Sequence, residues 1–255
     1  MLLRRVSQHV KDQNWFAVVL DFSIVVIGVF IGIQVSNWND ARNEASQEQV
    51  ILASIVDDLR SDELQLNDGI RMAENNIRAA NYTLEQAGLR PIGNIEFASS
   101  SIDFSSGRLY IPQIQGEFEQ TNRLWSQAVV RYHPTQSSAA FDTLMATGDL
   151  GLIKDRELVQ QLQTYQLLWN DIEGSQNTTF RPFRNQAIFV GQKFGLSPFT
   201  DMPEQEFVEL VSKQSELEGT LRTIAEYSVI HRDLLEQTRK LNQELMARVS
   251  QDIEL

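Results

Sequence analysis

The chain carries near its start an unbroken apolar run, WFAVVLDFSIVVIGVFIGIQV, in which only Asp21 and Gln34 are strongly polar. As a helix, a run of this length matches a bilayer hydrocarbon core of about 30 Å. Fourteen of the residues from 16 to 35 are Phe, Val, Leu or Ile. They favour insertion by roughly 4–8 kcal/mol, whereas Asp21 costs about 2.5–3.5 kcal/mol at the bilayer centre and less near its edge. We therefore expect a transmembrane helix over residues 16–36.

The residues that flank the run predict its orientation. Trp15 and Trp38 bracket it, as amphipathic rings do at the two headgroup levels. Arg4 and Arg5 make the segment 1–15 net basic, and basic flanking segments stay in the cytoplasm. We expect these four side chains to act as membrane-interface anchors, and the rest of the chain, residues 37–255, to lie outside the cytoplasm.

A cleaved secretory signal is the main alternative to a membrane anchor. The apolar part of such a signal is about 7–15 residues long and is followed by a pair of small residues at the cleavage site. The run here is longer, and the sequence after it, SNWNDARNEA, offers no such pair. The pattern therefore favours an uncleaved signal-anchor.

Two features inside the run have competing interpretations. Gly28, Gly32 and Ser36 recur every fourth residue and form a candidate transmembrane contact face, since small residues let two helices approach closely. The alternative is that glycine is simply common in membrane helices. Asp21 is either a functional carboxylate inside the membrane or, as we favour, a residue at its cytoplasmic boundary, with the span starting near Phe22.

Residues 44–88 have the pattern of one long helix. Apolar residues form two rows with a spacing of seven and an offset of four, which is typical of coiled coils. The first row is Leu52, Leu59, Leu66, Ala73 and Ala80, and the second is Val56, Glu63, Ile70, Ile77 and Leu84, where only Glu63 is polar. Gly88 and Pro91 predict the end of the helix, because glycine caps helices and proline cannot continue them.

The middle of the chain is less regular. Residues 89–118 are rich in glycine, proline and serine and predict a long loop with short strands around 95–97 and 109–111. Shorter helices are expected over 119–195. One of them, AAFDTLMATG, would be capped by Ser137 or Ser138 and closed by Gly148, and the next would be capped by Asp155.

The region 203–250 mirrors the first long helix with a second, approximately heptad seam of apolar residues: Leu217, Leu221, Ile224, Leu234, Leu241, Leu245 and Val249. Two long helices at the ends of one domain, joined by shorter ones, indicate an antiparallel arrangement. The predicted fold class is mainly α: one transmembrane helix followed by an antiparallel helical bundle with long, coiled-coil-like first and last helices.

The composition excludes several kinds of chemistry. The net charge of −12 argues against a nucleic-acid partner, whose phosphates need a basic face, and the absence of cysteine removes thiolate sites and disulfides. His9, His133 and His231 are not in a metal-binding spacing, and His231 is expected to be a hydrogen-bonded histidine of the bundle. No catalytic or phosphate-binding motif is present. We therefore predict no metal, no cofactor and no enzymatic activity.

Two weaker candidates for a site remain. The carboxylate pairs Asp57–Asp58, Asp62–Glu63 and Asp142 with Asp149 would suit acid–base or cation chemistry, although such pairs are usually solvated. An aromatic cluster that includes Tyr165, Trp169, Phe180 and Phe183 is a candidate ligand pocket, although aromatic stripes at helical spacing usually belong to a core.

Two stretches, DFSIVVIGVFIGIQVSNWND in the apolar run and AFDTLMATGDLGLIKDRELVQQLQTY at 140–165, resemble an uncharacterised bacterial family of small single-span proteins with a helical domain across the membrane. The resemblance implies a bacterial inner-membrane protein with a periplasmic domain. It implies no activity.

Three classes of function follow. The first is a scaffold or accessory subunit of a membrane complex, whose partners are the lipid bilayer and either a second copy or another membrane protein. The second is a periplasmic ligand-binding or sensor module that signals through a partner. The third, a hydrolase that uses carboxylates, would require Asp142, Asp149 and a third carboxylate in one cleft.

Overall fold

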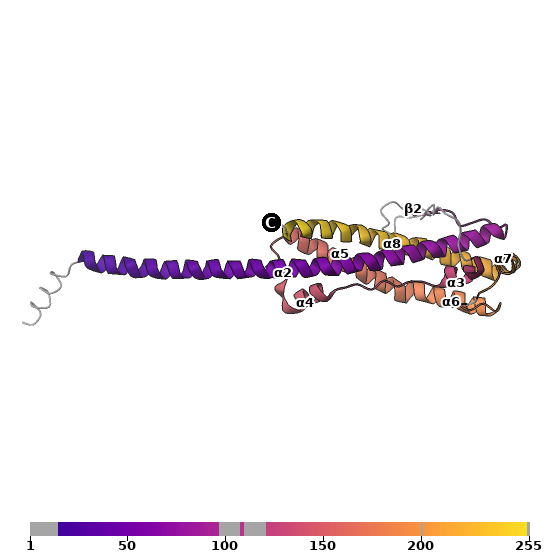
Figure 1. Ribbon diagram of the computed structural model, residues 1–255, viewed down its shortest axis with the longest axis horizontal. Helices are drawn as coiled ribbons and strands as arrows, with labels where there is room; N and C mark the ends of the chain where they lie inside the picture. Colours follow the sequence, from indigo (N-terminus) through magenta and orange to yellow (C-terminus); the bar gives the residue numbers. More distant parts are fainter. Residues whose placement is uncertain (1–14, 97–107, 110–120, 200, 254–255) are drawn as a thin grey trace, which may run out of the picture. The chain divides into compact units, whose positions relative to one another are not determined.

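One helix, α2 (Trp15–Gln86), contains both the apolar run and the predicted helix at 44–88, with no break between them. It belongs to a computed structural model that describes residues 15–96, 108–109, 121–199 and 201–253 (Figure 1). The chain divides into two units, Met1–Ile51 and Leu52–Leu255. Helices dominate both, so the predicted mainly helical class is confirmed.

The end of α2 has the predicted glycine cap. Gly88 has a φ of 69°, in the left-handed region that favours glycine. The Leu89 amide donates to the Leu84 carbonyl at 2.8 Å, which satisfies one of the last carbonyl groups of the helix. The two short strands that follow, β1 (Ile95–Glu96) and β2 (Arg108–Leu109), pair antiparallel close to their predicted positions. The rest of the predicted loop at 89–118 lies outside the described residues.

The second unit is completed by six helices of the described chain: α3 (Leu124–Val129), α4 (Ala139–Thr147), α5 (Arg156–Ser175), α6 (Arg181–Gln192), α7 (Glu204–Lys213) and α8 (Ser215–Ile253). Short 3-10 turns, Thr121–Arg123 and Asp149–Leu152, precede α3 and α5. Figure 1 shows α8 alongside α5 and the later part of α2. Side-chain bonds join Gln243 to Glu63 and Arg239 to Asn67, so residue numbers fall along α8 as they rise along α2. The two long helices are therefore antiparallel, as predicted.

Three rows of α2, rather than two, face the interior of the second unit. The first and second rows are buried as predicted except at Glu63, which is half-buried. The third row was missed because it is mostly polar or small. It consists of Ile55, Asp62, Gly69, Asn76 and Thr83, all buried. A helix that packs against neighbours on two sides needs such a wide inward face.

The seam of α8 also passes through polar residues. Leu234 and Leu241, which the apolar pattern selected, are only half-buried. The buried residues at alternating steps of three and four are Leu217, Leu221, Ile224, Ser228, His231, Leu235, Thr238, Asn242, Leu245 and Val249. The prediction was wrong at these two positions. At 234 and 235 two leucines are adjacent and hydrophobicity cannot tell which faces inward, while at 241 and 242 hydrophobicity favours Leu241 over the buried Asn242.

Helix α5 continues into α6 through one turn of π-helix, Gln176–Phe180. Pro182 follows this wide turn. In a regular α-helix, its ring would clash with the carbonyl of the residue four positions before it, and its nitrogen has no hydrogen to donate. The wider turn accommodates the proline, so the helical path continues from α5 into α6.

A close contact between two helices fixes the core around Trp125, which is 2% exposed and packs edge-on to Phe207. Its ring lies directly on Gly191 of α6, where an added Cβ would stand 2.3 Å from Cζ2 of the indole. Only glycine fits at this position while the tryptophan keeps its place.

Candidate functional site

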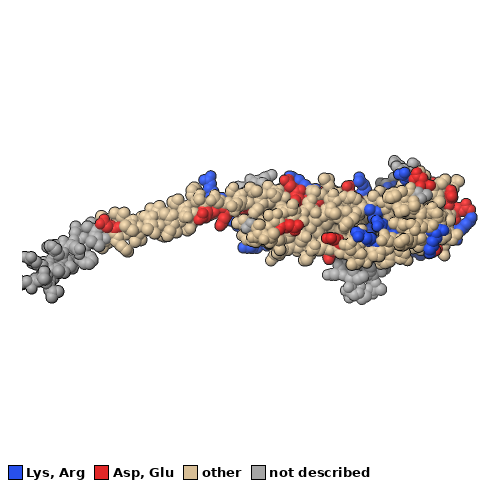
Figure 2. Space-filling model, turned by 90° about the horizontal axis from the view of Figure 1, so that it is seen from below, with Lys and Arg blue, Asp and Glu red and all other residues tan. Residues whose placement is uncertain are grey.

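The first candidate surface is the apolar stretch of α2. From Val19 to Val35 the large apolar side chains are all exposed, by about half or more of their surface: Val19, Leu20, Phe22, Ile24, Val25, Val26, Ile27, Val29, Phe30, Ile31, Ile33 and Val35. Figure 2 shows a continuous stretch of this helix without acidic or basic side chains. In the described part of the chain, α2 is the one helix long and apolar enough to cross a membrane, with a window of mean hydropathy 2.2.

The proposed contact face lies on this stretch. Gly28 and Gly32 have open space where a Cβ would stand, and Ser36 is exposed. Asp21 is exposed as well. Trp38 is 65% exposed, with the Arg42 guanidinium 5.8 Å from its ring centre. Arg4, Arg5 and the side chain of Trp15 lie outside the described part of the chain.

The second candidate region starts where an extended segment, residues 130–138, lies along the third row of α2. The Asn76 amide donates to the carbonyls of Gln127 and Val130 at 2.6 and 2.8 Å. One heptad earlier, an added Cβ on Gly69 would stand 3.3 Å from Pro134. One further heptad earlier, Asp62 accepts from the Ser137 amide at 2.5 Å. The third row is polar or small because it holds this segment.

The N-terminus of α4 is bound by α2 rather than by its own serines. Ser138 precedes the helix, but its hydroxyl donates to Asp142 at 2.6 Å and makes no capping bond. Asp58 instead accepts from the Ala140 amide at 2.8 Å. A carboxylate suits this position because the first amides of a helix lack partners and carry partial positive charge. Capping of α4 by Ser137 or Ser138 was wrong, whereas Asp155 caps α5 as predicted.

Asp62 lies at the centre of a buried polar network. Its side chain is 1% exposed and accepts from the Tyr165 hydroxyl at 2.8 Å. Asn242 of α8 donates both to that hydroxyl, at 2.7 Å, and to the Leu59 carbonyl, at 3.0 Å. Burial raises the pKa of Asp62 to about 7, although the bonds from Ser137 and Tyr165 favour its charged form. The network thus joins α2, α5, α8 and the extended segment.

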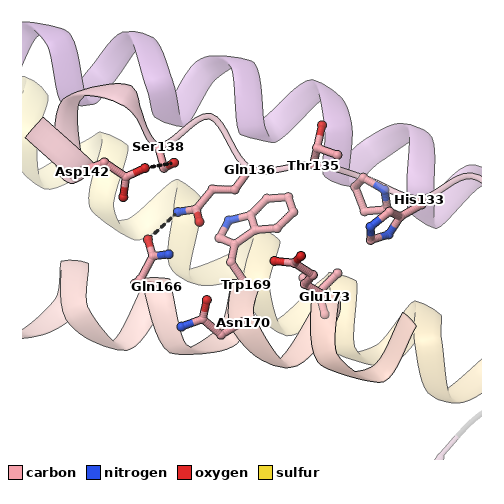
Figure 3. Close-up of a pocket in the computed structure, with 11 residues that line it drawn as sticks. His133, Thr135, Gln136, Ser138, Asp142, Gln166, Trp169, Asn170 and Glu173 are labelled. Atoms are coloured by element: carbon pink, nitrogen blue, oxygen red, sulfur yellow. Dashed lines mark hydrogen bonds between the residues drawn. The ribbon is translucent and has the colours of Figure 1, made fainter. Parts of the chain in front are cut away.

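A polar pocket of about 270 Å³ opens beside this network, between the extended segment and α5. Figure 3 shows Trp169 projecting from α5 toward the segment, with His133 near one end and Asp142 near the other. Gln136 and Gln166 bond to each other across it at 3.0 Å. Glu173 and Asn170 complete its polar wall. Amides, hydroxyls and carboxylates around an indole suit a small polar molecule.

The four aromatic residues of the predicted pocket do not meet in one cavity. Trp169 lines the polar pocket, while Tyr165 borders a crevice of about 20 Å³ beside Asp62. Phe183 lines a separate groove of about 370 Å³ between α6 and α8. Phe180 is buried against Tyr227 and His231. Fifteen residues of nearly continuous helix separate Tyr165 from Phe180, or about 22 Å of rise.

The predicted carboxylate pairs are also distributed. Asp57 is exposed and pairs with Arg60 at 3.0 Å, Asp58 caps α4, and Glu63 accepts from Gln243. Asp142 is exposed at the pocket, and the side chain of Asp149 is outside the described region. Within the described residues, no three His, Asp or Glu side chains gather as they would around a metal ion. His231 is buried on the α8 seam as expected, yet neither ring nitrogen has a hydrogen-bond partner among the described residues.

Comparison with known proteins gives one match. No curated protein and no solved structure is similar to the chain. The model of a family of unknown function (DUF6090) matches residues 21–185, which are 165 of the 255 residues and include most of the apolar run, the extended segment and α5. The protein therefore belongs to this family of unknown function.

Proposed function

We propose that the protein is a scaffold or accessory subunit of a bacterial inner-membrane complex. Residues 16–36 anchor it, its N-terminus is cytoplasmic, and its helical unit acts in the periplasm. The observation that carries the proposal is the exposed apolar stretch from Val19 to Val35. Large apolar surfaces are costly in water, and this one has the length of a bilayer core.

The basic flank and the open face support the finer parts of the proposal. Arg4 and Arg5 precede the span, which by the positive-inside rule favours a cytoplasmic N-terminus. Gly28, Gly32 and Ser36 leave room for a second helix to approach closely. A second copy or another single-span protein would fit that face.

Fractionation of the full-length protein in a Gram-negative bacterium tests the anchor. We expect it to stay with membranes after alkaline carbonate extraction. Replacing Ile27 and Ile31 with arginine, at about 2.5–3.5 kcal/mol each, should release it. The matched control is Leu64→Arg with Leu167→Arg, two exposed leucines of the helical unit, which should leave it in the membrane. Release of the wild-type protein by carbonate would contradict the proposal.

Two further measurements test orientation and partnership. Alkaline phosphatase fused after Leu255 should be active, and an inactive fusion would reverse the orientation. After extraction in mild detergent, the protein should co-purify with a defined partner or run as an oligomer. Substituting Gly28 and Gly32 with isoleucine should disrupt that assembly without releasing the protein from the membrane. A wild-type monomer without partners would contradict the scaffold role.

A second function, a ligand-binding module that signals through a partner, is favoured by the polar pocket beside Trp169. It shares the anchor with the first proposal and differs in requiring a small molecule. Binding by that pocket separates the two.

A further inference from the structure

Two basic side chains contact Phe180 in the second unit, and together with two further ones they form a group that we call the basic cluster. The guanidinium of Arg131 lies 4.4 Å from the centre of the Phe180 ring, and the His231 ring lies 4.8 Å from it. Arg184 and His133 belong to the same cluster. Arg184 is close enough to lower the pKa of Arg131, and His133 is close enough to lower the pKa of His231. Cations and imidazoles therefore meet here inside the bundle.

The cluster contains buried nitrogen atoms without hydrogen-bond partners. Buried nitrogen atoms of all four residues have no hydrogen-bond partner among the described residues: Nη2 of Arg131, Nδ1 of His133, Nε of Arg184, and both ring nitrogens of His231. His231 is 1% exposed. A buried polar group without a partner costs free energy, and a buried charge without one costs more. Such groups gathered at one place indicate a ligand that supplies the acceptors.

Other half-buried arginines of this fold show what is missing. Arg222, Arg239 and Arg248 each contact a carboxylate of the chain at 2.9 Å or closer. No acidic side chain of the described chain forms an ion pair with Arg131 or Arg184. Burial and the neighbouring Arg184 lower the pKa of Arg131 to about 10, so its cation is present near neutral pH but poorly stabilised.

The polar pocket gives access to the cluster. Arg131 and His133 are two apart in an extended segment, so both side chains point to the same side of it. Tyr132 between them points to the other side and bonds Gln65 of α2. His133 lines the pocket, at the end away from Asp142 in Figure 3. Glu173 also lies in the pocket wall. Its charge raises the pKa of His133, whereas the neighbouring arginines lower it.

We propose that this pocket and the basic cluster form one binding site for a small organic oxyanion, with the anionic group bound by Arg131, His133 and Arg184. The polar body of the ligand lies beside Trp169, where Gln136, Gln166 and Asn170 can donate and accept hydrogen bonds. Guanidinium and imidazole donors suit the oxygens of a phosphate or carboxylate. The site lies within Leu52–Leu255 and does not depend on membrane anchorage.

Thermal unfolding of the full-length protein in a non-ionic detergent tests this site. The probes are inorganic phosphate, glycerol 3-phosphate and neutral glycerol, each against sodium chloride at equal ionic strength. A ligand that binds only the folded state raises Tm with concentration. We expect both phosphates to raise Tm, glycerol 3-phosphate at the lower concentration, and glycerol to have no effect at about 1 mM.

Substitutions identify the residues involved. Arg131→Met should abolish the rise in Tm, whereas Arg156→Gln, at an exposed arginine of α5, should keep it. Without added anion, Arg131→Met should melt no lower than wild type, because it removes a buried cation without an acidic partner and keeps an apolar side chain against Phe180. An equal rise in Arg131→Met and wild type would overturn the proposal. So would a wild type that responds to neither phosphate. Equal potency of the two phosphates would overturn the part that assigns the ligand body to the pocket.

Discussion

Helix α2 presents apolar side chains in two opposite ways along its length. From Val19 to Val35 they cover the whole circumference and are exposed. From Leu52 to Leu84 most of them occupy one broad stripe and are buried, while the outer face is mainly polar apart from Leu64. A helix that is apolar all round suits a lipid surrounding, and one with an apolar stripe suits a protein neighbour. The distribution of apolar residues around the helix, more than their number, distinguishes the two environments.

The largest expected effect is at the centre of the buried stripe. Leu66 is 0% exposed. Leu66→Ala should lower the free energy of unfolding by about 3–5 kcal/mol, because it leaves a cavity in a packed core. Urea unfolding of the detergent-solubilised protein measures this change. Carbonate extraction should still leave the variant in the membrane fraction. Simultaneous loss of membrane association would show that the two stretches are not independent.

A smaller effect tests the acid within the stripe. The pKa of Asp62 is about 7 in the fold against an ordinary 3.8, so between these values the folded state holds a proton that the unfolded state has released. The contribution of Asp62 to stability is therefore complete below pH 3.8 and is lost as pH rises toward 7. The slope is about 1.4 kcal/mol per pH unit.

Asp62→Asn removes this titration. The difference in free energy of unfolding between the variant and the wild type should shift in favour of the variant by about 2–3 kcal/mol from pH 5 to pH 8. His231 has the opposite influence, since burial lowers its pKa, but it is common to both proteins and cancels in the comparison. If the difference in free energy of unfolding between the two proteins were the same at both pH values, Asp62 would not have a raised pKa in the fold.

Next in size is the polar attachment of the extended segment. Asn76→Ala removes two hydrogen bonds and leaves the carbonyls of Gln127 and Val130 without their donor, which should cost about 2 kcal/mol. Asn75→Ala, at the half-buried neighbour, is the control. Hydrogen exchange of residues 130–138 should increase in the first variant and not in the second. Equal exchange in both would mean that the third row does not hold the segment.

The smallest expected change in the free energy of unfolding is on the outer face of α2, two residues before Leu66. Leu64 is 68% exposed. Leu64→Ala should alter the free energy of unfolding by no more than about 0.5 kcal/mol, although the substitution is chemically the same as Leu66→Ala. A large loss would mean that a partner or a second copy covers this leucine.

The sequence predicted the apolar part of this arrangement and missed its polar part. Asp62 and Glu63 both lie three or four residues from Leu59 and Leu66, so spacing alone cannot decide which one faces inward. The choice depends on the extended segment and Tyr165, which are distant in sequence and bind Asp62. The same holds on α8, where Asn242 is buried because Tyr165 and the Leu59 carbonyl accept from it.

The candidate sites were predicted to different degrees. The apolar run follows directly from composition, since every residue in it contributes independently to insertion. The polar pocket depends on the path of residues 130–138, which no local pattern encodes. Trp169 was selected for its aromatic character, but the residues that surround it are amides and acids of two separate segments. Arg131 has no sequence signal, because a single arginine usually lies in solvent.

The contact between Trp125 and Gly191 has an evolutionary consequence. Because a single added carbon at position 191 would overlap the indole, position 191 cannot accept a larger residue while Trp125 stays unchanged. A mutation to alanine at 191 becomes neutral only in a background where position 125 has already become smaller. In relatives that keep this packing, the two sites should therefore substitute in a fixed order, with loss of the tryptophan preceding loss of the glycine.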